Sequence, residues 1–274
     1  MRGWTRVYEF TTLDTDSNAT IAQYRRSSSG YLAYLVVSDG EAAVIDPLRA
    51  FTDEYLADVR AFDTELTYAL DTHIHADHLS GVRELAGRTG ATAVVPEAAA
   101  ARGDDYDVAF DTLANGETLS VGTVDIDGIH TPGHTEGMTA YAVENVLFTG
   151  DGLFTDRVVR PDFEDPAAAR NAAQTLYESL TRTVSTRPFE TIVAPAHSSD
   201  SATPTDDGTV TATLGELTET LAALSMDEAE FVAADLPPRP ANYETVIAAS
   251  LGAESLDDVT AFELELDPNN CAAN

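Results

Sequence analysis

The chain has 274 residues, 43% of them hydrophobic, and a formal net charge of −32, and all 15 of its basic residues are arginine. A chain of this length and hydrophobic content can bury one sizeable core, whereas its acidity disfavours a nucleic-acid partner, because phosphate binding needs basic patches. No run of about 18 apolar residues is present, so we expect neither a transmembrane helix nor a membrane partner. The acidic residues are spread through apolar segments, which is typical of a folded protein from a very salty, halophilic cytoplasm.

The same features predict one cytoplasmic domain over residues 1–274, with its core at about 20–200, a helical segment at 209–252 and a tail at 253–274. Residues 1–12 lack the apolar centre of a signal peptide. The single cysteine, Cys271, excludes an internal disulfide and suits a reducing cytoplasm.

Short apolar runs alternate with amphipathic stretches in the first third of the chain. The turn residues Ser38-Asp39-Gly40 join two runs and predict a β-hairpin. Thr52 is the expected cap of the first helix, and Gly90 is expected to end the second. The elements predicted here, in chain order, are strands at 31–37 and 41–45, a helix at 52–62, a strand at 66–70, a helix at 79–89 and a strand at 91–95.

The rest of the chain repeats this arrangement and ends in helices. Two strand-rich halves, each followed by helices, indicate an α/β fold in which two sheets pack face to face with helices outside, in the order αββα. The remaining predicted elements are strands at 124–129, 139–143, 146–149 and 191–194, and helices at 166–181, 213–224, 226–234 and 239–251.

Residues 72–78 read Thr-His-Ile-His-Ala-Asp-His and place three of the chain's six histidines beside a carboxylate. Buried imidazoles without partners are costly, and three so close together would repel one another when protonated. A metal cation removes both problems, since neutral imidazole and carboxylate are usual ligands of zinc and of non-haem iron. The alternative is a polar surface loop with chance histidines, and the concentration of histidine in one heptad argues against it.

Further residues of metal-binding type follow later strands. They are His134 in Thr-Pro-Gly-His-Thr, Asp151 in Phe-Thr-Gly-Asp and His197 in Ala-Pro-Ala-His. Because all the candidates come just after strands, we expect them on loops along one edge of the sandwich, where catalytic groups usually lie. His130 is the only histidine outside this set, and we expect it to support a loop. Asp46 is expected to be structural, near the metal loop but outside the ligand set.

The whole set, H-x-H-x-D-H followed by H, D and H, resembles the metallo-β-lactamase superfamily over about residues 30–197. Residues 150–163 are similar to the G-D-x-L-F-x-x-x-x-G-R-P-D-L run of the persulfide dioxygenases, with Val159 in place of the usual glycine. The 31–35 strand, Ile45-Asp46-Pro47, the 236–243 segment and the end around Cys271 also resemble that branch.

The resemblance to persulfide dioxygenases implies a mononuclear Fe(II) held by His73, His134 and Asp151, with three positions left for water, substrate and O2. The implied reaction is oxidation of a low-molecular-weight thiol persulfide by O2 to sulfite and thiol. Arg160 would anchor a substrate carboxylate through its planar fork, and a salt bridge with Asp162 is the alternative role. Related proteins are often dimers, which leaves a homodimer open.

The same residues also support a second enzyme class, the dizinc hydrolases of thioesters or lactones that resemble glyoxalase II. There one zinc takes His73, His75 and His134, the other takes Asp77, His78 and His197, and Asp151 bridges them. Around a single iron, His75, Asp77, His78 and His197 would instead lie outside the metal's ligands. Glyoxalase II holds glutathione with lysines, which this chain lacks. A third interpretation, a non-catalytic metal-stabilised binding protein, is disfavoured by the open coordination positions.

Overall fold

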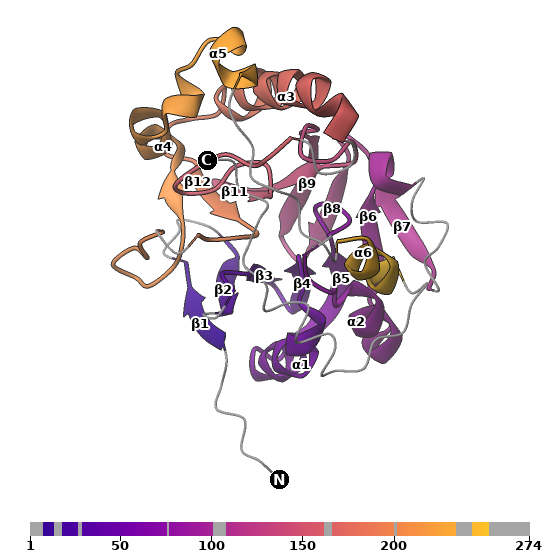
Figure 1. Ribbon diagram of the computed structural model, residues 1–274. Helices are drawn as coiled ribbons and strands as arrows, with labels where there is room; N and C mark the ends of the chain where they lie inside the picture. Colours follow the sequence, from indigo (N-terminus) through magenta and orange to yellow (C-terminus); the bar gives the residue numbers. More distant parts are fainter. Residues whose placement is uncertain are drawn as a thin grey trace.

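The computed structural model of the protein describes residues 8–13, 18–26, 29–75, 77–100, 108–161, 166–199, 202–233 and 243–251. Two β-sheets pack face to face, and helices cover both outer faces (Figure 1). Helices α1 and α2 lie on one side of the sandwich, and α3, α4 and α5 lie on the other. The αββα arrangement expected from the sequence is confirmed.

The first sheet has seven strands that follow one another in chain order. Its first four strands form antiparallel neighbours, whereas the last four run parallel to one another. The carboxyl ends of β4 and β5 therefore meet at the same edge. The strands are β1 (Tyr8–Thr12), β2 (Thr20–Arg26), β3 (Leu32–Ser38), β4 (Glu41–Ile45), β5 (Glu65–Leu70), β6 (Thr92–Pro96) and β7 (Phe110–Leu113).

The second sheet has six strands in the order β13-β12-β11-β10-β9-β8. Strands β11 and β12 are parallel neighbours, so the loops that follow them also leave from one edge. The strands are β8 (Thr118–Val121), β9 (Val124–His130), β10 (Thr139–Val143), β11 (Val146–Gly150), β12 (Ile192–Pro195) and β13 (Ala212–Thr213).

The core has three layers, and strand periodicity assigns side chains to them. On β3, Leu32 and Tyr34 face the layer between the sheets, whereas Ala33 and Leu35 face the layer under α1 and α2. A third layer joins the outer face of the second sheet to α3, α4 and α5. Because successive strand residues point to opposite faces, a strand covered on both sides reads as a continuous apolar run, as β3 and β4 do.

The helices confirm most of the predicted segments and shift their ends. Thr52 is not a cap: α1 begins at Thr52 itself, Phe51 occupies the N-cap position, and the Thr52 hydroxyl donates to the Arg49 carbonyl oxygen at 2.8 Å. Gly90 does end α2, in the left-handed conformation. The helical elements are η1 (Arg49–Phe51), α1 (Thr52–Ala61), α2 (Val82–Thr89), η3 (Pro166–Ala168), α3 (Ala169–Glu178), η4 (Ser179–Val184), α4 (Leu214–Thr220), η5 (Ala222–Leu224), α5 (Glu228–Val232) and α6 (Tyr243–Leu251).

Strands β1, β2, β7, β8 and β13 were not predicted from the sequence. Three of them, β1, β7 and β8, are short strands with mostly exposed or half-buried side chains. No apolar run marks such strands, because half or more of their residues face solvent.

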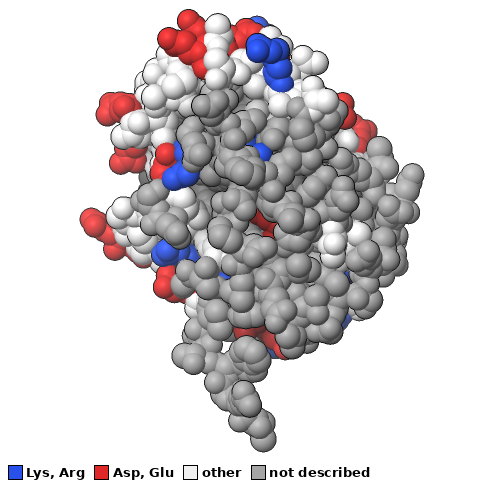
Figure 2. All heavy atoms as spheres, viewed as in Figure 1, with Lys and Arg blue, Asp and Glu red and all other residues white. Residues whose placement is uncertain are grey.

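The surface carries the acidity that the composition indicates. Figure 2 shows Asp and Glu side chains around the rim of the described surface, including the region of α4 and α5, with few basic side chains between them. Some acids pair with arginine, as in Arg88 with Asp53 at 2.6 Å, but 47 acidic residues face only 15 basic ones. Within the described residues, no helix has the length and apolar character needed to cross a membrane.

Candidate metal centre

The candidate ligands come from four segments that meet at one edge of the sandwich. The loop after β5 carries His73, His75, Asp77 and His78, the loop between β9 and β10 carries His134, and Asp151 and His197 follow β11 and β12. All seven side chains are buried, with Asp77 the most exposed at 9%. The parallel pairing of β11 with β12 explains why residues far apart in sequence arrive side by side.

His73, His134 and Asp151 form one group of buried donors whose ligand atoms lie within 4.8 Å of one another. Oδ2 of Asp151 lies 3.9 Å from Nε2 of His73 and 3.8 Å from Nε2 of His134. Each imidazole is held from its other side. Nδ1 of His73 lies 3.0 Å from the Thr72 hydroxyl, and Nδ1 of His134 donates to the Arg160 carbonyl oxygen at 3.0 Å. These contacts leave both Nε2 atoms as electron-pair donors facing Asp151.

Asp77, Asp151 and His197 form a second group, which shares Asp151 with the first. Nε2 of His197 lies 2.7 Å from Oδ2 of Asp77, and Nδ1 of His197 contacts Oδ1 of Asp151. His78 completes this side of the centre, with Nδ1 3.3 Å from Oδ1 of Asp77. The ring of His78 lies 4.0 Å from that of His75, and the ring of His75 lies 4.1 Å from that of His73, centroid to centroid. His75 therefore connects the two groups.

The donor set fits a metal ion. In the described part of the chain, Nδ1 of His75, Nε2 of His78 and Oδ2 of Asp151 are buried and make no hydrogen bond. Buried polar atoms are almost always paired, and leaving one unpaired costs about 1–3 kcal/mol. Imidazole nitrogens and a carboxylate oxygen are the atoms that zinc and non-haem iron bind, so unpaired atoms of these types are what a metal-binding cluster presents before its metal is bound.

Burial and neighbouring charges prepare these groups for a cation. Burial, together with the adjacent imidazoles, lowers the pKa of both His73 and His75, so each is neutral at pH 7. Burial alone would raise the pKa of Asp151, but His197 outweighs it and holds the pKa below its usual value. Burial would lower the pKa of His197, but the negative charges of Asp151 and Asp77 outweigh burial and raise this pKa to about 10. Without a metal, His197 is therefore a cation between two carboxylates.

Asp46 orients the metal loop from behind. It has a left-handed backbone conformation, with φ of 50°, and follows β4. Its carboxylate accepts hydrogen bonds from the Thr72 amide at 2.7 Å, the Thr72 hydroxyl at 3.0 Å and Nε2 of His75 at 3.0 Å. Burial raises its pKa to about 6, so it is ionised at neutral pH. Asp46 thereby fixes which nitrogen of His75 carries the proton, and through Thr72 it does the same for His73.

Tyr31 supports the other side of the centre and was not among the site residues predicted from the sequence. Its hydroxyl donates to the Asp77 carbonyl oxygen at 2.5 Å, and its ring packs against those of His78 and His197, with centroids 5.1 and 4.7 Å away. Tyr31 lies in the apolar 31–35 strand, and no local signal in the sequence connects it to Asp77, 46 positions along the chain.

Two further sequence expectations concern His130 and Arg160. His130 lies outside the cluster, and its Nε2 donates to the Glu136 carbonyl oxygen at 2.9 Å, in keeping with a role in supporting a loop. The side chain of Arg160 is buried, at 1% exposure, and its backbone carbonyl oxygen accepts the hydrogen bond from Nδ1 of His134. Asp162, Cys271 and most of the 236–243 segment lie outside the described residues.

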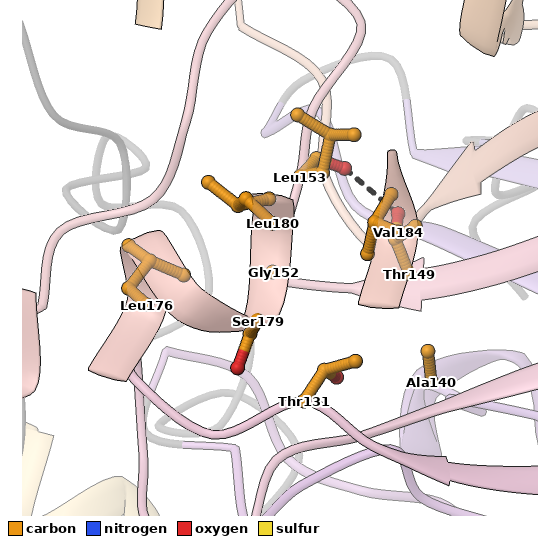
Figure 3. Close-up of a pocket in the computed structure, with 9 residues that line it drawn as sticks. All are labelled: Thr131, Ala140, Thr149, Gly152, Leu153, Leu176, Ser179, Leu180 and Val184. Atoms are coloured by element: carbon orange, nitrogen blue, oxygen red, sulfur yellow. Dashed lines mark hydrogen bonds between the residues drawn. The ribbon is translucent and has the colours of Figure 1, made fainter. Parts of the chain in front are cut away.

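A small cavity lies between the end of the second sheet and α3 (Figure 3). Its wall includes Thr131 and Thr149, close in sequence to His134 and Asp151, and much of the remainder is apolar. The Thr149 hydroxyl donates to the Leu153 carbonyl oxygen at 2.7 Å, as drawn in the figure. No candidate ligand lines this cavity, so it is distinct from the metal centre.

Comparison with protein families matches residues 29–197 to the metallo-beta-lactamase superfamily, which is more than half of the chain. The chain belongs to the metallo-beta-lactamase superfamily. The matched range begins just before Tyr31 and ends at His197, so it contains every candidate ligand of the centre. This confirms the resemblance drawn from the sequence motifs.

Curated proteins similar to the chain include members of two enzyme classes. The mitochondrial persulfide dioxygenase ETHE1 of Mus musculus is 28% identical over 160 residues, which are 57% of this chain and 59% of that protein. The hydroxyacylglutathione hydrolase of Rhodospirillum rubrum is 34% identical over 143 residues, which are 51% of this chain and 54% of that protein. The chain thus spans less than two thirds of the length of these relatives.

Solved structures of the superfamily share the fold over a larger part of the chain. ETHE1 from Myxococcus xanthus has a TM-score of 0.73 at 28% identity, covering 85% of this chain and 98% of that one. A metallo-beta-lactamase from Staphylococcus aureus has a TM-score of 0.78 at 24% identity, covering 88% of this chain and 75% of that one. TTHA1623, solved in a di-iron-bound form, has a TM-score of 0.55 at 24% identity, covering 70% and 93%.

Proposed function

We propose that the protein is a persulfide dioxygenase-like enzyme with a mononuclear iron centre on His73, His134 and Asp151. The observation that carries the proposal is the arrangement of this triad. Two imidazoles present Nε2 toward one carboxylate, with their Nδ1 atoms beside Thr72 and the Arg160 carbonyl. Two histidines and one carboxylate on one face leave coordination positions for both substrate and O2.

The overall reaction we propose is R–S–SH + O2 + H2O → R–SH + SO3²⁻ + 2 H⁺, in which the outer sulfur is oxidised and O2 is reduced. When bound, Fe(II) would supply the one-electron chemistry that allows O2 to react with the persulfide. The chain's own residues hold the site in place. Asp46 and Thr72 keep the protons of His73 and His75 away from the cation, and Arg160 is proposed to anchor a carboxylate of the thiol carrier.

Three findings support the dioxygenase over the hydrolase. The run from Gly150 to Arg160 resembles the persulfide dioxygenases, and the ETHE1 structure matches most of the chain. The chain has no lysine, whereas glyoxalase II uses lysines to hold glutathione. The dizinc hydrolase remains the second candidate because Asp77, Asp151 and His197 are also gathered, as a second metal ion would require.

Metal analysis of anaerobically purified protein, followed by O2 uptake and sulfite formation with glutathione persulfide, tests the proposal. We expect about one iron per chain and O2-dependent sulfite. His134→Ala should lose iron and O2 uptake together, because removing one of three protein ligands forfeits much of the binding free energy. His197→Ala should keep about one metal and retain measurable sulfite production, since losses outside the ligands usually cost about 10–100-fold.

The hydrolase gives a different result in each measurement. It predicts two zinc ions per chain, hydrolysis of thioesters or lactones without O2, and loss of one metal ion together with hydrolysis in His197→Ala. Anaerobic ester hydrolysis without O2 uptake on any persulfide would overturn the dioxygenase proposal. Full activity with full iron content in His134→Ala would overturn the ligand assignment.

A further inference from the structure

Helix α6 packs against the loop that carries the candidate metal ligands. Val246 and Ala249 form a buried cluster with Leu79, the residue that follows His78. Ile247, the next residue of the helix, packs against a second buried cluster that contains Ala99 and Ile74, the residue between His73 and His75. Ile74 and Leu79 are 5% and 1% exposed, so both apolar side chains of the loop are covered. The helix thus contacts the loop at Ile74 and at Leu79, on either side of the segment that carries His75 and His78.

Ser250 adds a polar contact to this apolar one. Its side chain is buried, and its hydroxyl lies 3.3 Å from the His78 carbonyl oxygen, to which it donates. The hydroxyl oxygen of Ser250 in turn accepts a hydrogen bond from the Ser80 amide at 3.3 Å. Ser250 therefore joins the backbone on both sides of Leu79, across 172 residues of sequence from His78. A buried hydroxyl with both a donor and an acceptor partner fixes the backbone more narrowly than apolar packing alone.

A short chain of hydrogen bonds carries this contact toward the metal centre. The Ser80 hydroxyl donates to the Asp71 carboxylate, 2.7 Å from Oδ2, and accepts the Val82 amide at 3.2 Å. Asp71 in turn lies 3.8 Å from Nε2 of His75. The loop from Asp71 to Ser80 is thus closed at its base by its own residues, and Ser250 holds that base from outside.

We propose that Ser250 is a positioning residue that fixes the backbone at His78, so that docking of α6 and metal binding are coupled. The coupling does not depend on whether one or two metal ions bind, because the loop supplies His73 to both arrangements. It requires that the centre bind a metal, but not that the reaction be persulfide oxidation. By thermodynamic reciprocity, a metal that binds better when α6 is docked must also stabilise the docked helix.

The first test compares Ser250→Ala with Ser38→Ala in the full chain. Ser38 is a matched control: it is equally buried, accepts the Thr123 amide at 3.2 Å and lies at the far end of β3, away from the centre. Co²⁺ titration by visible absorption should give about 10-fold weaker binding and an altered cobalt spectrum for Ser250→Ala. Ser38→Ala should lose a similar amount of thermal stability in the metal-free protein and keep the wild-type spectrum and affinity. Ser250→Thr, which restores the hydroxyl, should recover the spectrum.

The second test uses the wild-type protein and does not depend on any variant folding. Hydrogen exchange of the amides in residues 246–251 should slow when Co²⁺ is added and recover when it is chelated. Equal Co²⁺ affinity and spectra for the two alanine variants, or unchanged exchange in α6, would overturn the inference. Either result leaves the dioxygenase proposal standing, whereas a protein that shows the coupling but no persulfide oxidation overturns only the proposed function.

Discussion

The ionisation of His197 in the metal-free protein follows from its contacts with two buried carboxylates. Asp151 and Asp77 raise its pKa to about 10, against 6.5 for an unperturbed histidine. A group whose pKa is higher in the folded state contributes stability that is complete below its unfolded pKa and is lost as pH rises through the folded one. The metal-free protein should therefore lose stability between pH 6.5 and about 10.

We expect the melting temperature of the metal-free protein, in concentrated KCl, to fall by roughly 2–4 °C for each 1 kcal/mol lost over this range. The absence of lysine removes one of the groups that would otherwise titrate there. His197→Gln should flatten the dependence, whereas His130→Gln, which changes a histidine outside the cluster, should keep it. A wild-type melting temperature that stays constant from pH 6.5 to 10 would contradict the conclusion that Asp151 and Asp77 keep His197 protonated in the metal-free protein.

Arg160 offers a prediction about substrate binding. Arg160→Lys should raise KM for the persulfide about 10-fold or more while leaving the metal content unchanged, because an ammonium cannot reproduce the two-pronged contact and a charge-assisted bond is worth about 1.5–3 kcal/mol. The carbonyl that holds His134 is backbone and survives the change. Arg157→Lys, at a more exposed arginine, should alter neither quantity. If Arg160→Lys lowers thermal stability and leaves KM unaltered, the arginine has a structural role instead.

Among the elements, α3 stands closest to the loop that carries His134. Gly133 has a φ of +141°, and a Cβ atom placed there would lie 2.5 Å from Cα of Leu176 and 2.7 Å from its amide nitrogen. The backbone of α3 thus packs directly on this loop, and the Ser179 hydroxyl at the end of the helix donates to the Pro132 carbonyl oxygen at 2.7 Å. Only glycine permits both the backbone angle and the close approach.

Gly133→Ala should therefore push the loop and α3 apart. We expect a loss of about 3 kcal/mol in the free energy of unfolding, from backbone strain together with overpacking, and weaker metal binding because His134 follows directly. Gly87→Ala is the matched control, since its Cβ would meet nothing within 4 Å on the exposed face of α2. That change should stabilise the protein by roughly 0.5–1 kcal/mol. Chemical denaturation of both variants, with and without metal, measures the effects, and a neutral Gly133→Ala would disprove the packing argument.

At the scale of the whole molecule, the charge predicts a dependence on salt. With 47 acidic and 15 basic residues, the folded surface repels itself in dilute buffer. The Debye length shrinks from about 10 Å at 0.1 M salt to about 3 Å at 1 M, so the melting temperature should rise steeply with KCl between these concentrations. An equal osmolality of sucrose should reproduce only a small part of the rise. A melting temperature independent of KCl would refute the halophilic interpretation.

Sequence alone was sufficient to list the candidate ligands that the fold brings together and to predict most of the strands that carry them. The heptad 72–78 and the residues His134, Asp151 and His197 could be found because each lies in a short motif of unusual composition. Buried strands such as β4 and β10 have their predicted bounds because both faces are apolar and the signal is local. The edge strands β1, β7 and β8 were missed for the opposite reason, since their side chains face solvent.

Only the tertiary structure determined the orientation of the candidate ligand side chains. Asp46 fixes the imidazoles of His73 and His75 from another strand, and Tyr31 holds the backbone of Asp77 across 46 residues. Ser250 reaches His78 across 172. These contacts depend on strand register and helix docking, which bring distant residues to hydrogen-bonding distance. A sequence specifies such pairings only through the whole packed core. Residue type and spacing therefore identify the candidate donors of the centre. Packing determines which atom of each donor faces the metal site.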